Sequence, residues 1–408
     1  MTRHILVANV FFAPFSYGGA TVVAEEVAKS LIALGGYRIT AVSLCSRSDL
    51  APYVLVKSQK EGIVNYLINV PPDRRYAEMY DNPEVTARLA ELVSALEPDL
   101  IHAHCIQEIG TGIVAVGETM NIPVILSTHD FWWLCDRQFM LRLDQSYCGQ
   151  FPVRIKDCRG CVDNYWAARL RFEHLQAIGQ KAALITYPSQ FAKTLSEASG
   201  FGPNRGVVWE NGVRLPSRKF FEAQAIRRAK DPRVTFGYVG GPAQIKGWPQ
   251  IREAFADMTR TDFRCVVVDG GLDRPWWKKA DFRSLPGDWQ IHPRYSQETM
   301  DAFYAEIDVL LFMSQWKETF GLAIREAIAR GIDVIQTDSG GTVEHPLASR
   351  ADLIPIGAPA HHLRGQIEGR LAQGHRRCSP EPVASFDVQA RNFAALVEGV
   401  LNNLHRAA

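Results

Sequence analysis

Short apolar runs rich in β-branched residues alternate with longer segments of helical periodicity along most of the chain. Ile5 to Asn9 is the first such run, and a helical pattern continues from Gly19 to about Leu34. Further strand-like runs lie at residues 39–44, 100–102 and 123–127, with another helical pattern at 83–97. This alternation is typical of a parallel sheet covered by helices. The first half of the chain is therefore predicted to be α/β.

The same alternation begins again in the second half. Val234 to Val239 is a strand-like run with two glycines after it, and further runs lie at residues 263–268, 289–292, 309–312 and 334–337. Two such series predict two Rossmann-like domains, residues 1–212 and 213–387, joined near residues 211–231. Sheets of this kind bind ligands beyond the carboxyl ends of their strands, so a cleft between the two halves is the expected site.

Size and charge narrow the class of protein. A chain of 408 residues is long enough for two or three domains, and 47% hydrophobic with 22% charged residues is ordinary for a globular protein. The formal net charge of +1, without a basic stripe, argues against a nucleic-acid partner. No run approaches the roughly 20 apolar residues of a membrane span. Asn9 and Pro14 interrupt the N-terminal apolar stretch, so no signal peptide is expected and a cytoplasmic location is favoured.

The segment from Asp308 to Pro346 carries the most specific chemistry. The strand-like run at 309–312 is followed by Glu318, and a helix with Glu326 inside it begins at Gly321. A helix start presents unpaired N–H groups and a positive dipole end, which suit a diphosphate. Two carboxylates would repel phosphate and are better suited to accept hydrogen bonds from sugar and ribose hydroxyls.

These residues resemble a known signature. Glu318-Thr-Phe-Gly-Leu-Ala-Ile-Arg-Glu326, then Gly331 and Asp338-Ser-Gly-Gly341, is similar to the E-x7-E motif of retaining glycosyltransferases of family 4 (glycosyl transferases group 1). The resemblance implies the GT-B fold, with two Rossmann-like domains facing an interdomain cleft and a last helix (388–408) packing back on the first domain. It also implies metal-independent transfer from a UDP- or GDP-type sugar donor to a hydroxyl of a glycan or lipid-linked glycan, in bacterial surface polysaccharide or lipopolysaccharide synthesis.

A second matching motif follows the first strand of the second half. The loop Gly240-Gly241-Pro242 to Lys246-Gly247 is similar to the family's phosphate loop, in which the lysine would neutralise the departing diphosphate. The family often carries an arginine shortly after the first glycine, where this chain has Gly241 and Pro242. That departure weakens the usual pair of cations.

The first half contributes further residues through the resemblance. Gly18 and Gly19 match a glycine-rich loop near the donor phosphate, His129 matches a histidine that contacts the sugar, and Asn211 matches a turn at the domain junction. The expected catalytic residues are His129, Lys246 and Glu318. The expected donor-binding residues are Gly18, Gly19, Gly240, Gly241, Lys246, Glu318, Phe320, Gly321, Leu322 and Glu326. His102 and His104 suit either a metal pair or structural residues lining the cleft.

Four cysteines form a separate cluster in the sequence: Cys135, Cys148, Cys158 and Cys161. Their spacing, with one C-x2-C pair, fits either a structural zinc ion or plain thiols; disulfides would require export. Aromatic and basic residues flank this segment at 131–133 and 166–172. They suit either a peripheral contact with the inner face of a membrane or buried aromatic rings with solvated arginines.

Two rival functions fit the same residues. One is a GT-B sugar-nucleotide epimerase, which would convert its donor without an acceptor. The other is a non-catalytic sugar-nucleotide-binding subunit, which the missing arginine near Pro242 motivates. The sequence leaves open the donor base, the sugar, the acceptor, the linkage and the oligomeric state.

Overall fold

The computed structural model describes residues 2–374 and 379–407, and the contacts between residues divide them into two units. The first unit contains Met1–Met140, Gly149–Gly212 and Ala384–Ala408, and the second contains Leu141–Cys148 and Val213–Val383. The predicted domains, 1–212 and 213–387, differ from these units in the short segment 141–148 and at 384–387.

The first unit is built on an eight-stranded sheet with the order β3-β4-β2-β1-β5-β6-β7-β8. Its strands are β1 (Arg3–Ala8), β2 (Tyr37–Cys45), β3 (Leu55–Lys60), β4 (Ile63–Asn69), β5 (Leu100–Ala103), β6 (Val124–Ser127), β7 (Leu184–Tyr187) and β8 (Gly206–Val208). Every neighbouring pair is parallel except β3 and β4. The predicted strands of this half are present, and the β3–β4 hairpin, β7 and β8 lie where no strand was predicted.

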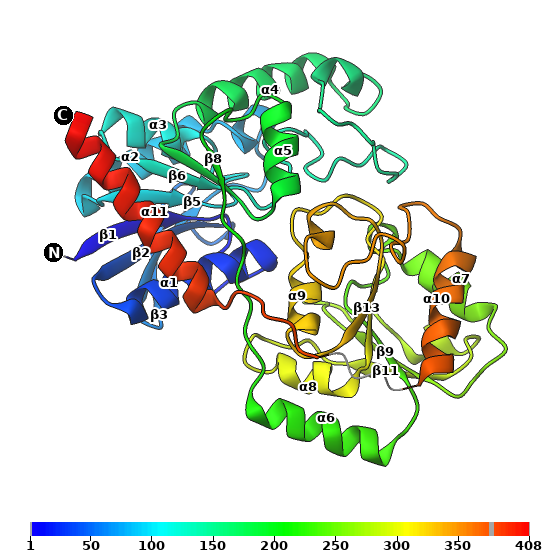
Figure 1. The fold of residues 1–408 in the computed structure, drawn as a ribbon. Helices are drawn as coiled ribbons and strands as arrows, with labels where there is room; N and C mark the ends of the chain where they lie inside the picture. The colour runs from blue at the N-terminus through cyan, green and yellow to red at the C-terminus, as the bar shows by residue number, and fades with distance from the viewer. Residues whose placement is uncertain (1, 375–378, 408) are drawn as a thin grey trace. The chain divides into compact units, whose positions relative to one another are not determined.

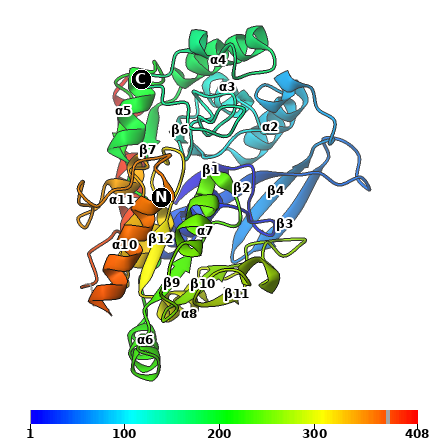
Figure 2. The ribbon, with the colours of Figure 1, turned by 90° about the vertical axis from the view of Figure 1, so that its right-hand side faces the viewer.

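Helices cover this sheet because each carries one apolar face. They are α1 (Gly19–Leu34), α2 (Pro83–Leu96), α3 (Gly112–Thr119), α4 (Tyr165–Gly179), α5 (Gln190–Ala198) and α11 (Phe386–Ala407). Helix α11 comes from the far end of the sequence and packs along α1 (Figure 1). Helices α2 and α3 pack against each other (Figure 2). The chain ends of the first unit are therefore part of one folded body.

The second unit is a five-stranded, all-parallel sheet with the order β11-β10-β9-β12-β13. The strands are β9 (Thr235–Tyr238), β10 (Arg264–Val268), β11 (Asp288–His292), β12 (Val309–Phe312) and β13 (Asp333–Gln336). Helices α7 (Trp248–Ala256) and α10 (Ala360–Gln373) cover one face, and α6 (Arg218–Lys230), α8 (Met300–Glu306) and α9 (Leu322–Ile328) the other (Figure 1). The first strand of the series thus lies at the centre, as in doubly wound folds.

Helix α6 occupies most of the stretch that was predicted to join the domains. Residues 211–231 were expected to be a connecting stretch because they are rich in basic residues, but the structure forms a helix from Arg218 to Lys230. Ser217 caps it by accepting a hydrogen bond from the N–H of Phe220, and Phe220 is buried in the core beside α8. The basic residues have a structural partner in Asp308, which directly precedes β12.

Asp308 is buried and accepts hydrogen bonds from Arg227 and Arg228, all at 2.8 Å, and from the N–H of Thr235 at 3.0 Å. Burial by itself raises the pKa of Asp308. The hydrogen bonds and charge of Arg227, with the charge of Arg228, outweigh it and leave the pKa below its usual range. This carboxylate therefore ties α6 to the starts of β9 and β12.

The variant Asp308→Asn is expected to lose about 3 kcal/mol of unfolding free energy at pH 7, because the two arginines keep their charge without the carboxylate. The folded pKa of Asp308 lies below the unfolded value, so its contribution is present above about pH 4 and is lost as the pH falls through the folded pKa. Urea unfolding from pH 7 to pH 3 measures this. The difference in unfolding free energy between wild type and Asp308→Asn should become smaller as the pH falls.

The control is Asp262→Asn, which removes an exposed carboxylate paired with Arg260 in the same unit. It should leave the urea midpoint close to that of wild type. A loss at Asp308 no larger than the loss at Asp262 would contradict the structural role of the buried carboxylate.

Candidate active site

In the second unit, the loops that follow β9, β12 and β13 lie at the same edge of the sheet, because these strands are parallel. The N–H of Gln315, after β12, donates to the carbonyl oxygen of Ile245, after β9, at 2.8 Å. Gly247 lies beside Met313 with φ +78°, and a β-carbon at this position would collide with the Met313 carbonyl oxygen. Glycine is therefore required where these two loops meet.

Lys246 and Glu318 form the charged centre of this edge. Lys246 Nζ lies 2.7 Å from Glu318 Oε1, and the Ser314 hydroxyl donates to the same oxygen at 2.6 Å. The Lys246 ammonium also lies 5.7 Å from the centre of the Trp316 ring. The two residues that the sequence assigned to catalysis in this half are thus in direct contact, and the lysine is already paired with a carboxylate.

Glu318 also joins the third loop through its backbone. Its N–H donates to Ser339, and its carbonyl oxygen accepts from Gly341, both at 2.9 Å. These bonds form a short parallel bridge between Glu318 and Gly340. The Asp338-Ser-Gly-Gly341 segment of the motif therefore fixes the backbone of the first glutamate.

Tyr238, the last residue of β9, holds the glycine-rich loop that follows it. Its hydroxyl donates to the carbonyl oxygens of Gly241 at 2.8 Å and Lys246 at 3.2 Å. Gly241 has φ +67°, and a β-carbon there would lie 2.7 Å from the Trp276 ring; at Gly240 it would lie 2.9 Å from the Tyr238 hydroxyl. A side chain at Gly241 would have a strained backbone conformation and would displace Trp276, so an arginine does not fit at this position without a rearrangement.

Glu326 has a different environment from Glu318. It is 6% exposed, and its carboxylate accepts a hydrogen bond from the Tyr304 hydroxyl at 2.8 Å. Burial raises the pKa of Glu326, and the hydrogen bond from Tyr304 partly opposes that shift. The Glu326 carboxylate is thus buried within the second unit and hydrogen-bonded to Tyr304. Its role toward a sugar or ribose hydroxyl stays a prediction.

Helix α9 begins where the sequence predicted, with Gly321 as its N-cap at φ +84° and Leu322 as its first residue. A positive φ of this size favours glycine. Phe320, just before it, is 3% exposed and packs beneath the buried guanidinium of Arg325, whose Cζ lies 4.3 Å from the ring centre. Phe320 therefore supports the loop from within.

Arg325 is the functional neighbour that sequence reasoning missed. Its guanidinium donates to four carbonyl oxygens at 2.6–3.1 Å, those of Phe320, Gly341, Thr342 and Glu344. A single arginine follows three apolar residues at the start of α9, and that position was the available signal. Arg325 fastens the loop before α9 to the loop after β13, and so holds the two ends of the motif together.

In the first unit three histidines line up at the carboxyl ends of β5 and β6. His129 Nε2 lies 2.8 Å from His104 Nδ1, and His104 Nε2 lies 3.2 Å from His102 Nδ1. His102 Nε2 lies 2.7 Å from the Ser127 hydroxyl oxygen. Burial lowers the pKa of His129 to about 4, and burial also holds the pKa values of His102 and His104 well below their usual range. The chain of rings is therefore neutral at pH 7.

The remaining residues predicted in the first unit have structural settings. Gly18 is the N-cap of α1 at φ +82°, and Gly19 is the first residue of that helix. Asn211 accepts a hydrogen bond from the Gln389 amide at 3.2 Å, and the N–H of Gly212 donates to the same side chain at 2.7 Å. The Asn-Gly turn is therefore fastened to α11.

The four cysteines of the predicted zinc site are not gathered into one group in the structure. Among residues 2–374 and 379–407, no three His, Cys, Asp or Glu side chains gather closely enough to hold a metal ion. This statement covers Cys135, Cys148, Cys158 and Cys161, and it covers the pair His102 and His104. Zinc on the four cysteines stays a prediction for metal analysis of the purified protein.

The aromatic residues around that segment divide into two groups. Phe131, Trp132 and Trp133 are buried, as the alternative of buried rings requires. Arg171 is also buried rather than solvated, because its guanidinium donates to the Trp132 carbonyl oxygen at 2.6 Å and lies over the Trp132 ring. Trp166 on α4 is exposed, so only part of the predicted membrane-facing set remains on the surface.

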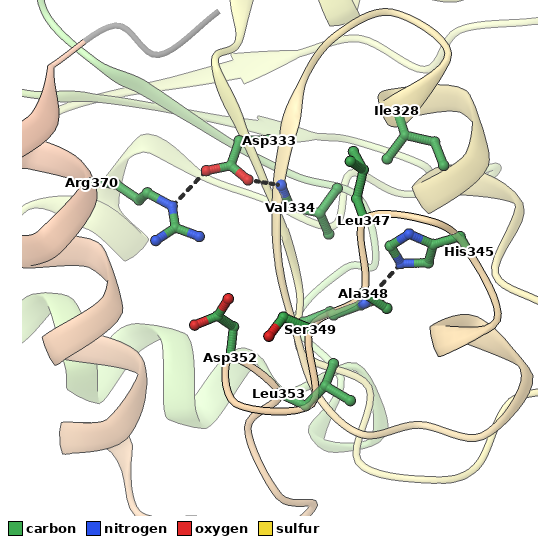
Figure 3. Close-up of a pocket in the computed structure, with 11 residues that line it drawn as sticks. Ile328, Asp333, Val334, His345, Leu347, Ala348, Ser349, Asp352, Leu353 and Arg370 are labelled. Carbon is green, nitrogen blue, oxygen red and sulfur yellow. Dashed lines mark hydrogen bonds and ion pairs between the residues drawn. The ribbon is translucent and has the colours of Figure 1, made fainter. Parts of the chain in front are cut away.

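A small polar cavity lies elsewhere in the second unit, at the outer edge of β13 (Figure 3). Its volume is about 140 Å³, and Arg370 and Asp333 form an ion pair on its wall. Gln336 donates to His345 Nε2 at 2.8 Å in the same wall. None of the residues predicted for the donor lines this cavity.

Comparison with family models agrees with this geometry. The model of Glycosyltransferase Family 4 matches residues 17–215, and the model of Glycosyl transferases group 1 matches residues 219–345. The first match contains His129 and the second contains Lys246, Glu318 and Glu326. Together the two models account for most of the chain.

Individual proteins with related sequences or folds cover nearly all of the chain. The GDP-mannose-dependent alpha-mannosyltransferase of Mycobacterium tuberculosis is 23% identical over 329 residues, which are 78% of this chain and 75% of that protein. Sucrose-phosphate synthase from Thermosynechococcus elongatus has a TM-score of 0.65 at 14% identity, covering 99% of this chain and 98% of that one.

A second similar structure was solved with ligands. Anabaena HepE in complex with UDP and glucose has a TM-score of 0.59 at 17% identity, and the match covers 99% of each chain. These likenesses confirm the predicted fold class, a GT-B arrangement of two parallel-sheet domains.

The variant Arg325→Met is expected to loosen the loop that follows β13, because four carbonyl oxygens lose a charged donor. The loss in unfolding free energy should reach about 3 kcal/mol, since hydrogen bonds to charged groups contribute about 1.5–3 kcal/mol each and are not additive. Hydrogen–deuterium exchange, read by mass spectrometry, should rise most in peptides covering residues 338–344.

The matched control is Arg364→Met on α10, which removes a guanidinium paired with Asp257 at the surface. Its exchange pattern should stay like that of wild type. Unchanged protection of residues 338–344 in the Arg325 variant would show that the loop does not depend on the guanidinium.

Proposed function

Because the chain belongs to the glycosyl transferases of group 1, we propose that it moves a sugar from a nucleotide diphosphate sugar to a hydroxyl of a glycan or lipid-linked glycan, with retention at the anomeric carbon. The observation that carries the proposal is the Lys246–Glu318 contact, 2.7 Å long, at the sheet edge where three loops join. A cation and a carboxylate held together there suit a ligand with both phosphate and hydroxyl groups.

Lys246 is proposed to stabilise the leaving diphosphate. An ammonium group has three donors, so Lys246 can keep its bond to Glu318 while it donates to a phosphate oxygen. The position of the Lys246 ammonium is fixed by two neighbours. Glu318, which pairs with it, is itself held by the Ser314 hydroxyl, and the Trp316 ring lies against the ammonium. Charge develops on the diphosphate as the bond to the sugar breaks, so a positioned cation lowers the barrier at that step.

The two glutamates and the first turn of α9 are proposed to hold the rest of the donor. Glu318 is fixed by side-chain and backbone bonds and is well placed to accept from a sugar hydroxyl. Backbone N–H groups near Gly321 and Leu322 suit the diphosphate. Glu326, beneath this turn, is assigned to a ribose or sugar hydroxyl.

His129 is the proposed contact between the sugar and the first unit. In a retaining front-face reaction the donor phosphate oxygen accepts the proton of the acceptor hydroxyl, the bond from the anomeric carbon to the diphosphate breaks, and the new glycosidic bond forms on the same face. A neutral histidine can donate to or accept from a sugar hydroxyl without adding charge, and burial keeps His129 neutral. No metal ion is needed for these steps.

Similar proteins support a nucleotide donor but not one base. HepE was solved with UDP and glucose, whereas the mycobacterial relative is GDP-mannose-dependent. We therefore propose a UDP- or GDP-type hexose donor and a role in bacterial surface polysaccharide or lipopolysaccharide synthesis, in line with the family's common uses.

The variant Lys246→Met keeps the aliphatic stem and removes the cation. Its kcat/KM for the donor is expected to fall about 10²- to 10³-fold, as for loss of one transition-state donor. Thermal unfolding with a panel of UDP, GDP and their sugar conjugates first identifies the donor. A ligand at about 100 times its Kd adds about 2.7 kcal/mol to the stability of wild type. Lys279→Met, at an exposed position, is the control and should behave like wild type.

The outcomes of this experiment separate the rival functions. Product formed from donor alone, without an acceptor, would indicate an epimerase. Binding of one nucleotide without turnover across a broad acceptor panel would indicate a non-catalytic subunit, which the missing loop arginine motivates. A stability shift with none of the nucleotides would contradict the transferase proposal.

A peripheral membrane contact is proposed for α4 on the first unit. Trp166 is 63% exposed and Leu170 is 64% exposed, and the Arg169 guanidinium lies 5.9 Å from the centre of a Trp166 ring. Exposed aromatic, aliphatic and basic residues on one helix face suit an anionic lipid surface. None of the helices within the described residues is long and apolar enough to cross a membrane.

Flotation with vesicles containing anionic lipid tests this contact. Wild type is expected to float with the vesicles, and Trp166→Ser with Leu170→Ser should reduce the bound fraction several-fold, because both changes remove apolar surface. Leu272→Ser, at an exposed position of the second unit, is the control. Equal flotation of the α4 variant and wild type, or no flotation of either, would rule out the proposed surface.

A further inference from the structure

The three histidines of the first unit form one continuous chain with two hydroxyl groups. It runs from His129 through His104 and His102 to Ser127, and the Ser127 hydroxyl lies 2.7 Å from that of Thr186. Register explains the alignment: His102 is on β5, Ser127 ends β6, and Ser127 pairs directly with Thr186 on β7. Three neighbouring parallel strands thus place the five groups in a row.

The direction of the hydrogen bonds in this chain depends on the middle ring, His104. His104 uses both nitrogens, Nδ1 toward His129 and Nε2 toward His102. A neutral imidazole has one donor and one acceptor, so a proton on Nε2 makes His104 donate to His102 and accept from His129; a proton on Nδ1 reverses both bonds. Either direction therefore requires all three rings to carry their proton on the same nitrogen.

A charged middle ring would change the pattern. A His104 imidazolium would donate from both nitrogens, so His129 and His102 would have to accept on opposite nitrogens and would no longer share one tautomer. The groups that act on His104 are burial and the rings of His102 and His129, and all of them lower its pKa. With neutral rings, every nitrogen contact between His129 and Ser127 is satisfied only when the bonds all run in one direction.

The inner end of the chain is held rigidly. His102 is 1% exposed and stacks on Phe393 of α11 with ring centres 4.0 Å apart and an angle of 18°. Trp209 lies 5.7 Å away on another side and is anchored by its N–H bond to the Gln389 carbonyl oxygen at 3.1 Å. His104 is 2% exposed, whereas His129 at the outer end is partly exposed. The inner rings have no room to turn, and the outer ring reaches the surface.

We propose that His104 and His102 are positioning residues for His129: their hydrogen bonds decide which nitrogen of His129 carries the ring proton. The inference rests on the proposed function, in which His129 contacts the donor sugar. The buried rings behind His129 therefore determine whether its sugar-facing nitrogen donates or accepts a hydrogen bond. Ser127 and Thr186 form the inner end of the chain.

Two variants of His104 test the proposal by activity. His104→Leu removes both bonds and is expected to lower kcat with the sugar donor about 10- to 100-fold, in the range seen when supporting hydrogen bonds are lost. The Kd for the bare nucleoside diphosphate should not change, because His104 acts through the sugar contact. His104→Gln supplies one donor and one acceptor and should restore most of kcat.

His174→Leu is the matched control, since it removes a hydrogen-bonded histidine of the same unit that lies outside the chain, bonded to Thr111. It should retain the kcat of wild type. Full activity in His104→Leu, or equal losses in the Leu and Gln variants of His104, would overturn the positioning role.

A second measurement does not depend on turnover. Nitrogen-15 spectra of the full-length protein, labelled at histidine, report which nitrogen of each ring is protonated. His102, His104 and His129 are expected to be neutral at pH 7 and to share one tautomer, and His104→Leu should change the nitrogen shifts of His102 and His129. Different tautomers in the three rings, or a charged ring, would overturn the inference even if the protein proves to be an active transferase. A shared tautomer in a protein that turns over no donor would leave the chain intact and contradict the proposed function instead.

Discussion

Parallel pairing is the constraint on which both functional clusters depend. Strands that run in one direction release all their following loops at one edge, so residues far apart in sequence become neighbours there. In the second unit this brings Lys246, after β9, to Glu318, after β12, at 2.7 Å. In the first unit it aligns the histidines after β5 and β6 with the hydroxyl group on β7. The order and direction of the strands thus determine which of these side chains meet.

Buried charge and buried polarity are handled differently in the two clusters. Arg325 and Asp308 are held by several partners each, which keeps their charges satisfied away from water and fixes the backbone around the motif. The histidine chain instead stays neutral and satisfies each nitrogen with the next ring. The first solution makes the loops around the Glu318 motif rigid, and the second leaves His129 at the end of a chain of neutral, hydrogen-bonded rings.

Particular residues show how far sequence reasoning reaches. The glycines at 240, 241, 247 and 321 could be recognised because a positive φ or a crowded β-carbon position favours glycine. Lys246 and Glu318 could be recognised from motif spacing. Arg325, Tyr304 and Asp308 could not, because their importance lies in partners supplied by other strands and helices. The basic segment 211–231 was predicted to be a connection, because nothing in the local sequence shows that Arg227 and Arg228 pair with Asp308.

The sequence by itself predicted the alternation of strands and helices and the two α/β halves, because hydrophobic periodicity and glycine placement are local properties of the chain. The family and its motif residues came from the resemblance of the segment Glu318–Glu326 to a known signature. Only the tertiary structure decided which of those residues touch. It paired the lysine with Glu318, enclosed Glu326 beside Tyr304, buried the tryptophans at 132 and 133, and joined three histidines into one chain. Such contacts depend on strand register and on which helix covers which face, and both are fixed only when the whole unit folds.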